Sequence, residues 1–267
     1  MSVLDMFRLS GNVAIVTGAH AWLGYDIACA LAEAGSEVVV TSRESSRARD
    51  TAAKIHNQFG VDTLGLEMDQ RRFDSVKTMA EKANAWKGHI DILVNNAGGG
   101  SGKSEGHLLK RNPEDEIDMI TTNLIGVLFC CKEAARVMVK QGHGKIINIA
   151  SNAGLIGRDR RLYQRSEMKG QPVDYAAAKG GVIALTRDLA GLLSPSGVYV
   201  NCISPGGFDK GGLPELFTRE FADRAMLGRW GRMGIDIKGA ALFLASHASD
   251  YVTGHNLVVD GGFSIWK

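Results

Sequence analysis

The feature that most constrains the fold is a regular alternation between short apolar runs and longer segments with helical periodicity. The apolar runs are rich in valine and isoleucine, and their apolar residues are consecutive rather than alternating. This pattern is typical of strands that helices cover on both faces of a parallel sheet. Seven runs fit it, at residues 12–17, 37–42, 61–68, 91–96, 145–151, 198–204 and 255–262.

Strands that alternate with helices in this way predict an α/β fold with a doubly wound, seven-stranded parallel sheet. The expected architecture is a Rossmann-type, three-layer α/β/α sandwich. The chain has 267 residues, of which 45% are hydrophobic, and can therefore bury one full core. We expect a single domain over residues 1–267.

Charge and cysteine content argue against several kinds of partner. The net charge of +2 gives no reason to expect nucleic acid or an acidic membrane surface. The first residues lack the apolar core of a signal peptide, and no segment reaches the roughly 18 apolar residues of a membrane helix, so we expect a cytoplasmic protein. No metal-binding spacing links the cysteines, and we expect them to be buried, reduced thiols: Cys29, Cys130, Cys131 and Cys202.

Three segments are expected to form substrate loops, at about 98–113, 157–172 and 207–228, and the first two interrupt the alternation. Long irregular loops in a compact domain are more often functional than accidental. The first two leave the carboxyl ends of expected strands, which is where ligands bind in open α/β sheets. The third combines glycines with a stretch over 213–226 that suggests a mobile helical lid.

The first expected strand is followed by TGAHAWLG, in which Gly18 and Gly24 enclose Trp22. Glycines between a strand and a helix let the backbone approach a pyrophosphate, which the N-terminus of the helix attracts. Such turns also occur where only packing requires them, so this segment alone leaves both interpretations open. Tryptophan has the largest side chain and is unexpected in a phosphate-binding turn.

Further motifs follow in order along the chain. They are Asp69, NNAG at 95–98, Asn123 in TTNLIG, Ser151 in IINIAS, YAAAK at 175–179, NCISPGG at 201–207 and YVTGHNLVVDGG at 251–262. Together with TGAHAWLG, this series resembles the classical short-chain dehydrogenase/reductase family over nearly the whole chain. The resemblance implies an NAD(P)-dependent enzyme, usually a homotetramer, that interconverts a carbonyl and a secondary alcohol by hydride transfer.

The spacing of Tyr175 and Lys179 places both side chains on one face of a helix. An ammonium group favours the phenolate of a nearby tyrosine, whose pKa is otherwise about 10, and this suits proton transfer. An isolated pair of this kind is more often a surface tyrosine with a solvated lysine. The resemblance favours catalysis: it implies that Tyr175 exchanges the proton, Ser151 orients the reacting oxygen, Asn123 holds a relay water, and Lys179 also binds the nicotinamide ribose.

The resemblance also implies where the cofactor binds. An acid at position 42 would bind the ribose of NAD, whereas Ser42 and Arg43 are suitable ligands for the 2′-phosphate of NADP. We expect NADP(H) to be preferred, with NAD(H) possible, although Ala21 stands where many NADP-using relatives have a basic residue. The implied cofactor-binding residues are Gly18, Leu23, Gly24, Ser42, Arg43, Asp69, Asn95, Ala97, Gly98, Tyr175, Lys179, Pro205, Gly206 and Phe208.

Two single residues depart from the family pattern. Trp22 replaces the central glycine of the phosphate turn, so either its backbone keeps the turn with the indole directed away from the phosphates, or the loop is displaced. A positive φ would strain a tryptophan. We favour retained cofactor binding with an altered loop. Lys210 stands where the family often has a threonine that contacts the cofactor, and it either meets a phosphate or points to water.

The third departure is an insertion between Ser151 and Tyr175. Its cations either bind a carboxylate or phosphate of the substrate or form a solvated or subunit-contacting loop, and the sequence leaves both open. Some family members with a similar insertion act on sugar acids and polyols, so a polar or anionic keto-sugar or sugar acid is the first expectation. The alternative substrate is a 3-oxoacyl thioester on a carrier protein. The alternative to an enzyme is a non-catalytic cofactor-binding module. The cations of the insertion are Arg158, Arg160, Arg161, Arg165 and Lys169.

Overall fold

The computed structural model describes residues 2–99 and 105–266. It contains a 7-stranded sheet in the order β3-β2-β1-β4-β5-β6-β7, and all neighbouring strands run parallel. Each strand overlaps one of the predicted apolar runs, so the predicted fold class is confirmed. The strands are β1 (Val13–Val16), β2 (Glu37–Ser42), β3 (Thr63–Glu67), β4 (Ile92–Asn95), β5 (Gly144–Ile149), β6 (Val198–Pro205) and β7 (Asn256–Val259).

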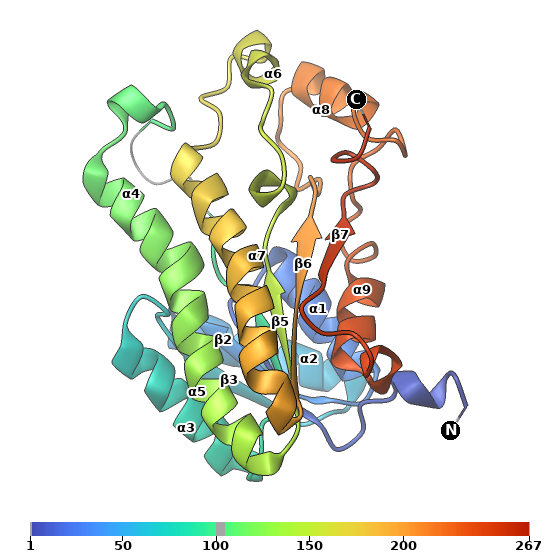
Figure 1. Cartoon of the computed structure of the whole chain (residues 1–267). Helices are drawn as coiled ribbons and strands as arrows, with labels where there is room; N and C mark the ends of the chain where they lie inside the picture. The colour runs from blue at the N-terminus through green and yellow to red at the C-terminus, as the bar shows by residue number, and fades with distance from the viewer. Residues whose placement is uncertain (1, 100–104, 267) are drawn as a thin grey trace.

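Helices cover both faces of the sheet (Figure 1). One layer contains α1, α2 and α9, and the other contains α3, α5 and α7. Two shorter helices, α6 and α8, lie beyond the carboxyl ends of the strands (Figure 1). The helices are α1 (Trp22–Glu33), α2 (Ser45–Phe59), α3 (Phe73–Lys87), α4 (Pro113–Ile120), α5 (Gly126–Gln141), α6 (Arg160–Arg165), α7 (Val173–Leu193), α8 (Glu215–Asp223) and α9 (Lys238–Ala245).

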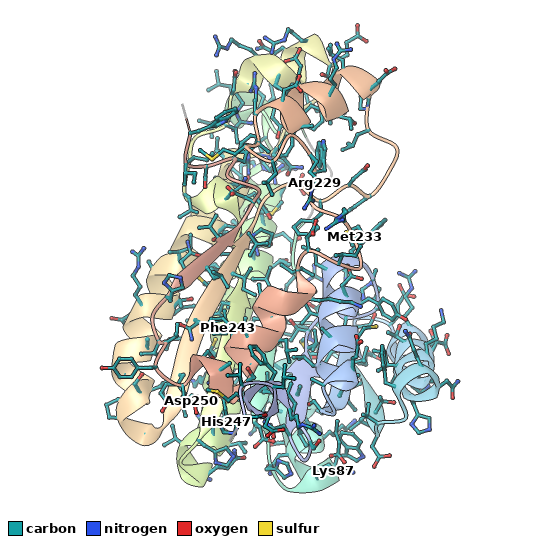
Figure 2. The ribbon with its side chains drawn as sticks, turned by 90° about the vertical axis from the view of Figure 1, so that its right-hand side faces the viewer. Lys87, Arg229, Met233, Phe243, His247 and Asp250 are labelled. Carbon is teal, nitrogen blue, oxygen red and sulfur yellow. The ribbon has the colours of Figure 1, made fainter. Side chains whose placement is uncertain are left out.

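The packing of β1 shows why the apolar runs are continuous. Val13 and Ile15 belong to the core beneath α3, α5 and α7, whereas the alternate residues of the strand belong to the core beneath α1, α2 and α9. Met233 and Phe243, labelled in Figure 2, pack against this second core. Because apolar packing occupies both faces, polar groups that act on ligands gather at the strand ends.

The four cysteines, Cys29, Cys130, Cys131 and Cys202, are buried and form no disulfide bond. Burial raises the pKa of each thiol, which keeps the reactive thiolate scarce. In the ranges 2–99 and 105–266, no helix combines the length and the apolar character needed to cross a membrane.

A buried ion pair holds the start of α7, the helix that carries Tyr175 and Lys179. Arg111 Nε donates to Asp174 Oδ2 at 2.7 Å, and the two side chains are 0% and 7% exposed. Asp174 Oδ1 also accepts a hydrogen bond from the backbone N–H of Tyr175 at 3.0 Å. The pair therefore ties the segment before α4 to the first turn of α7.

We expect Arg111→Met to lower the free energy of unfolding by about 3–5 kcal/mol, because it leaves the Asp174 carboxylate buried without its cation. The double variant Arg111→Met/Asp174→Asn should lose less than the sum of the two single variants, because the residues act as a pair. Urea denaturation followed by circular dichroism measures all three losses. Strictly additive losses would show that the two side chains contribute independently.

Candidate active site

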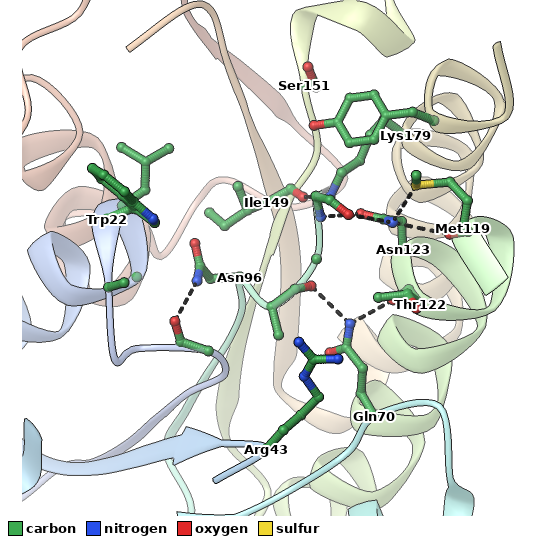
Figure 3. Close-up of a pocket in the computed structure, with 18 of the residues that line it drawn as sticks. Trp22, Arg43, Gln70, Asn96, Met119, Thr122, Asn123, Ile149, Ser151 and Lys179 are labelled. Carbon is green, nitrogen blue, oxygen red and sulfur yellow. Dashed lines mark hydrogen bonds between the residues drawn. The ribbon is translucent and has the colours of Figure 1, made fainter. Parts of the chain in front are cut away.

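A cavity of about 580 Å³ opens at the carboxyl ends of the strands. Segments that follow β1, β2, β3, β4, β5 and β6 all contribute to its wall (Figure 3). The structure thus brings together site residues that the sequence spreads over most of the chain. Those that line the cavity are Gly18, Leu23, Gly24, Ser42, Arg43, Asp69, Ala97, Gly98, Asn123, Ser151, Tyr175, Lys179, Pro205, Gly206 and Phe208.

Two glycines shape the turn between β1 and α1. Gly18 has a φ of 63°, and a Cβ there would lie 3.0 Å from the Cα of Ala97. A Cβ on Gly24 would lie 2.3 Å from Asn96 Nδ2, so a larger residue does not fit. Ala21, at the N-cap of α1, offers no side-chain acceptor to the first N–H groups of the helix. These N–H groups and the helix dipole fit the pyrophosphate of a dinucleotide.

Trp22, the first residue of α1, has a φ of 55°. This is the left-handed conformation that favours glycine, and it costs a non-glycine residue about 1–3 kcal/mol. The loop therefore keeps the turn despite the tryptophan. The indole is 52% exposed and lies on one side of the cavity, across from Asn123 and Met119 (Figure 3).

The end of β2 presents one available cation to the cavity. Arg43 lines the cavity and forms no ion pair with any residue in the described ranges. Ser42, by contrast, is 4% exposed, and its Oγ accepts a hydrogen bond from the N–H of Glu44 at 3.2 Å. Burial lowers the pKa of His20, so the neutral imidazole adds no charge at neutral pH. Arg43 is therefore the group that suits an anionic substituent of the cofactor.

Asp69 follows β3 and is held as an ion pair. Arg71 Nη2 donates to Asp69 Oδ2 at 2.7 Å, and Arg71 Nη1 donates to Asp118 Oδ1 at 3.0 Å. Hydrogen bonds from Arg71 hold the pKa of the Asp69 carboxyl below its usual range. Asp69 therefore forms an ionised, fixed part of the cavity wall.

Ser151, Tyr175 and Lys179 all line the same cavity. Ser151 lies just beyond β5, and the other two residues lie one turn apart on α7. Lys179 Nζ lies 5.8 Å from the centroid of the Tyr175 ring and donates to the carbonyl oxygen of Ile149 at 2.8 Å. Lys179 is 3% exposed, and burial lowers its pKa to about 8. The lysine is therefore a desolvated cation beside the tyrosine at neutral pH.

Asn123 lies in a π-helical turn, Thr121–Ile125, that joins α4 to α5. Its Oδ1 accepts a hydrogen bond from the N–H of Gly99 at 2.6 Å, and its Nδ2 donates to the carbonyl of Met119 at 3.1 Å. Such turns are frequent at functional sites. Asn123 is 0% exposed and lies against the cavity. Residues 100–104 of the predicted loop 98–113 lie outside the described residues.

The electrostatics of Tyr175 differ from the expectation that Lys179 would favour its phenolate. Burial raises the pKa of Tyr175, and it outweighs the Ser151 hydroxyl and the Arg158 charge, which both lower it. Tyr175 is therefore protonated at neutral pH. Arg158 Cζ lies 5.5 Å from the centroid of the Tyr175 ring, so the insertion supplies a second cation beside the ring.

Two of the arginines in the insertion, Arg161 and Arg165, form ion pairs with carboxylates of the protein. Arg165 of α6 pairs with Glu220 of α8. Asp159, which precedes α6, pairs with Arg161 at 2.9 Å and with Arg224, just after α8, at 2.9 Å. These ion pairs join the insertion to the helix that occupies the predicted lid. Arg161 and Arg165 are thus held by carboxylates of the same chain, which is neither the substrate contact nor the solvated or subunit-contacting loop that the sequence left open.

Arg158 is placed differently from these arginines. Its Nη1 donates to the carbonyl of Pro172 at 3.2 Å, which holds the guanidinium beside Tyr175. In the described ranges, Arg158 forms no ion pair with a carboxylate. Burial lowers its pKa, although an arginine remains charged. This arginine is the insertion residue that suits an anionic substrate.

Asn95 is a predicted cofactor residue that the structure places in the sheet instead. It is 2% exposed, and its Nδ2 donates to Asn148 Oδ1 at 2.8 Å. Its neighbour Asn96 lines the cavity and donates through Nδ2 to the carbonyl of Thr17 at 2.9 Å. Successive residues of a strand point in opposite directions, and this alternation could have separated the two asparagines.

Gln70 is a second residue that sequence reasoning did not identify. It lines the cavity, and its Nε2 donates to the carbonyls of Ala97 and Thr122 at 2.9 Å and 2.6 Å. It thereby ties the segment after β4 to the helix that carries Asn123 (Figure 3). No local pattern marks this role, because both partners are backbone groups distant in sequence.

Comparison with known proteins agrees with this geometry. The family described as Enoyl-(Acyl carrier protein) reductase matches residues 18–264. The chain is 35% identical to 2-dehydro-3-deoxy-D-gluconate 5-dehydrogenase of Escherichia coli (strain K12), over 98% of each chain. It is 34% identical to 3-oxoacyl-(acyl-carrier-protein) reductase FabG of Aquifex aeolicus (strain VF5), over 96% of this chain and 98% of that protein.

Among solved structures, the chain is similar to a gluconate 5-dehydrogenase from Burkholderia cenocepacia J2315 in complex with NADP and tartrate. The TM-score is 0.89 at 33% sequence identity, and 100% of each chain is covered. The fold, the site and these relatives define an NAD(P)-dependent oxidoreductase, so the non-catalytic alternative is set aside. The chain belongs to the short-chain dehydrogenase/reductase family.

The lowered pKa of Lys179 predicts a pH-dependent contribution to stability. Between pH 8 and about 10.5 the unfolded chain still binds the lysine proton, whereas the folded protein has released it, so the free energy of unfolding rises with pH. Relative to Lys179→Met, the wild type should gain about 3 kcal/mol across this range. Urea denaturation at several pH values measures the difference.

The comparison with Lys179→Met isolates this lysine, because buried tyrosines and thiols act in the opposite direction in both proteins. Their raised pKa values make the unfolded chain lose protons first. A difference between the two proteins that stays constant with pH would contradict the lowered pKa.

Proposed function

We propose that the enzyme interconverts the carbonyl and the secondary alcohol of an anionic keto-sugar acid, with NADP(H) as the preferred cofactor. Arg158 carries the substrate class: its guanidinium lies 5.5 Å from the Tyr175 ring centroid and is free of carboxylate partners in the described ranges. A guanidinium fork matches the geometry of a carboxylate. The relatives named 2-dehydro-3-deoxy-D-gluconate 5-dehydrogenase and gluconate 5-dehydrogenase support this class.

The proposed chemistry assigns one role to each catalytic residue. The nicotinamide supplies or accepts the hydride when it is bound. In the reducing direction, the Tyr175 hydroxyl donates its proton to the carbonyl oxygen, and the Ser151 hydroxyl orients that oxygen. The raised pKa of Tyr175 keeps this proton in place at neutral pH. Lys179 stabilises the phenolate that remains, binds the nicotinamide ribose, and receives protons through a water that Asn123 holds.

The proposed cofactor preference depends on Arg43. This arginine directly follows β2, lines the cavity and has no carboxylate partner within the described ranges. The position before it is Ser42, so no acid repels a 2′-phosphate there. The Burkholderia relative, whose structure is a complex with NADP, supports this preference.

Arg43→Ala should weaken NADPH binding by about tenfold, because a charge-assisted hydrogen bond to the 2′-phosphate is lost. NADH binding should change by less than about twofold, because NADH lacks that phosphate. Titrations that follow cofactor fluorescence measure both dissociation constants. Arg47→Ala is the matched control, because Arg47 is a nearby surface arginine that pairs with Glu44 at 2.8 Å. An equal loss for NADPH and NADH would exclude selective recognition of the phosphate.

Arg158→Gln should lower kcat/KM for a keto-sugar acid by about 100-fold, because a charge-assisted contact with the carboxylate is lost. The matching neutral keto-sugar should lose no more than about threefold. Steady-state assays with both substrates measure the difference. Arg161→Gln, which alters an arginine already paired with Asp159, serves as the control. Equal losses on both substrates would mean that Arg158 acts on Tyr175 alone.

A 3-oxoacyl thioester on a carrier protein is the second candidate substrate. The matching family carries an acyl-carrier-protein description, and the Aquifex relative is named for this activity. The same assay separates the candidates when a 3-oxoacyl thioester is added to the substrate panel. Turnover of the thioester without turnover of any keto-sugar acid would favour the second candidate.

We further propose that residues 1–267 form a single domain with substrate loops at about 98–113, 157–172 and 207–228, and that the protein is a cytoplasmic homotetramer. Free, buried thiols suit a reducing compartment. Apolar side chains at the surface of α5 and α7 support contacts between subunits. Leu128, Val139 and Leu192 are 39%, 41% and 69% exposed.

A further inference from the structure

Trp22 has an unfavourable, left-handed backbone conformation. Its side chain is exposed, so burial of the indole does not compensate for the cost of that conformation. Its φ of 55° is one of two positive values at non-glycine residues in the described ranges, the other being at Glu167. The indole is 52% exposed, so the ring is not anchored in a core. Backbone strain of this kind clusters at active sites and ligand clamps. The position of the indole therefore calls for a functional explanation.

The indole lies beneath a cation from a distant part of the chain. Lys210 Nζ lies 4.8 Å from the centroid of the Trp22 ring, which is a cation–π arrangement. Trp22 follows β1 and Lys210 follows β6, and the sheet places β4 and β5 between these strands. The pair thus connects the phosphate turn to the loop that leads into α8.

Both residues line the cavity that suits the dinucleotide. Within the described ranges, Lys210 forms no ion pair with a carboxylate, so its ammonium is available to an anion. The first N–H groups of α1, beside Trp22, have no side-chain cap from Ala21 and attract phosphate. An ammonium held at this rim adds a second positive group to the helix N-terminus.

We propose that Trp22 and Lys210 form a clasp that retains the bound dinucleotide by its phosphates. The face of the indole holds the Lys210 ammonium at the rim of the cavity, and the ammonium binds a phosphate oxygen. The left-handed conformation of Trp22 keeps the indole in this position. Its strain destabilises the cofactor-free protein, and the clasp that it permits slows release of the bound cofactor. The inference rests on the proposed cofactor site.

Stopped-flow displacement of NADPH from the full-length protein tests the clasp through the release rate. Trp22→Ala and Lys210→Met should each raise this rate by about fivefold. The double variant should release NADPH no faster than either single variant, because both changes remove one shared contact. Lys132→Met is the matched control: it removes an ammonium that lies 5.0 Å from the Phe73 ring, outside the cavity wall, and should leave the rate unchanged.

Trp22→Gly separates the strain from the clasp. Glycine adopts a φ of this sign without steric cost, so the cofactor-free variant should melt about 2–4 °C above the wild type. Trp22→Ala keeps the strain and should not gain stability, yet both variants should release NADPH equally fast. The clasp alone would be overturned if Trp22→Gly and Trp22→Ala both released NADPH at the wild-type rate. It would also be overturned if the rate increases of Trp22→Ala and Lys210→Met multiplied in the double variant. A wild-type protein that fails to bind NADPH would overturn the cofactor site as well.

Discussion

Burial of the sheet on both faces is the constraint on which the rest of the structure depends. A polar side chain that points into such a core needs hydrogen-bond partners from the protein, and Asn148 has them: it accepts from Asn95 at 2.8 Å and donates to Thr186 Oγ1 of α7 at 3.0 Å. Groups that lie just beyond the strand ends are free of this demand. Asn95 therefore bonds within the core, whereas the next residue, Asn96, lines the cavity.

The same burial sets the chemistry of the two residues at the reacting end of the cavity. Desolvation disfavours the charged form of any buried group, so it lowers the pKa of Lys179 and raises that of Tyr175. Burial thus leaves a protonated tyrosine beside a lysine whose proton is more easily released, and both line one cavity. A surface pair with the same spacing would keep both ordinary pKa values, which is why spacing alone is weak support for catalysis.

The sequence was sufficient to predict the fold, because apolar periodicity acts locally, and the family resemblance supplied about half of the residues in the cavity wall. It could not assign the cations of the insertion, since the partner of Arg165 is Glu220 on a helix 55 positions away. The pKa of Tyr175 was wrongly expected to fall, because its burial arises from segments that are distant in sequence. Whether Trp22 would keep the turn was likewise open, since φ depends on how the whole turn packs.

The contacts between α6 and α8 have a consequence for how these two helices can move or be altered. Besides their ion pairs, the two helices share an aromatic contact, with the Tyr163 and Phe217 ring centroids 5.1 Å apart. Neither helix can swing outward alone without exposing these rings and separating the charges. The ion pairs and the aromatic contact therefore join α6 and α8 into one packed unit, and a substitution in either helix must preserve its contacts with the other.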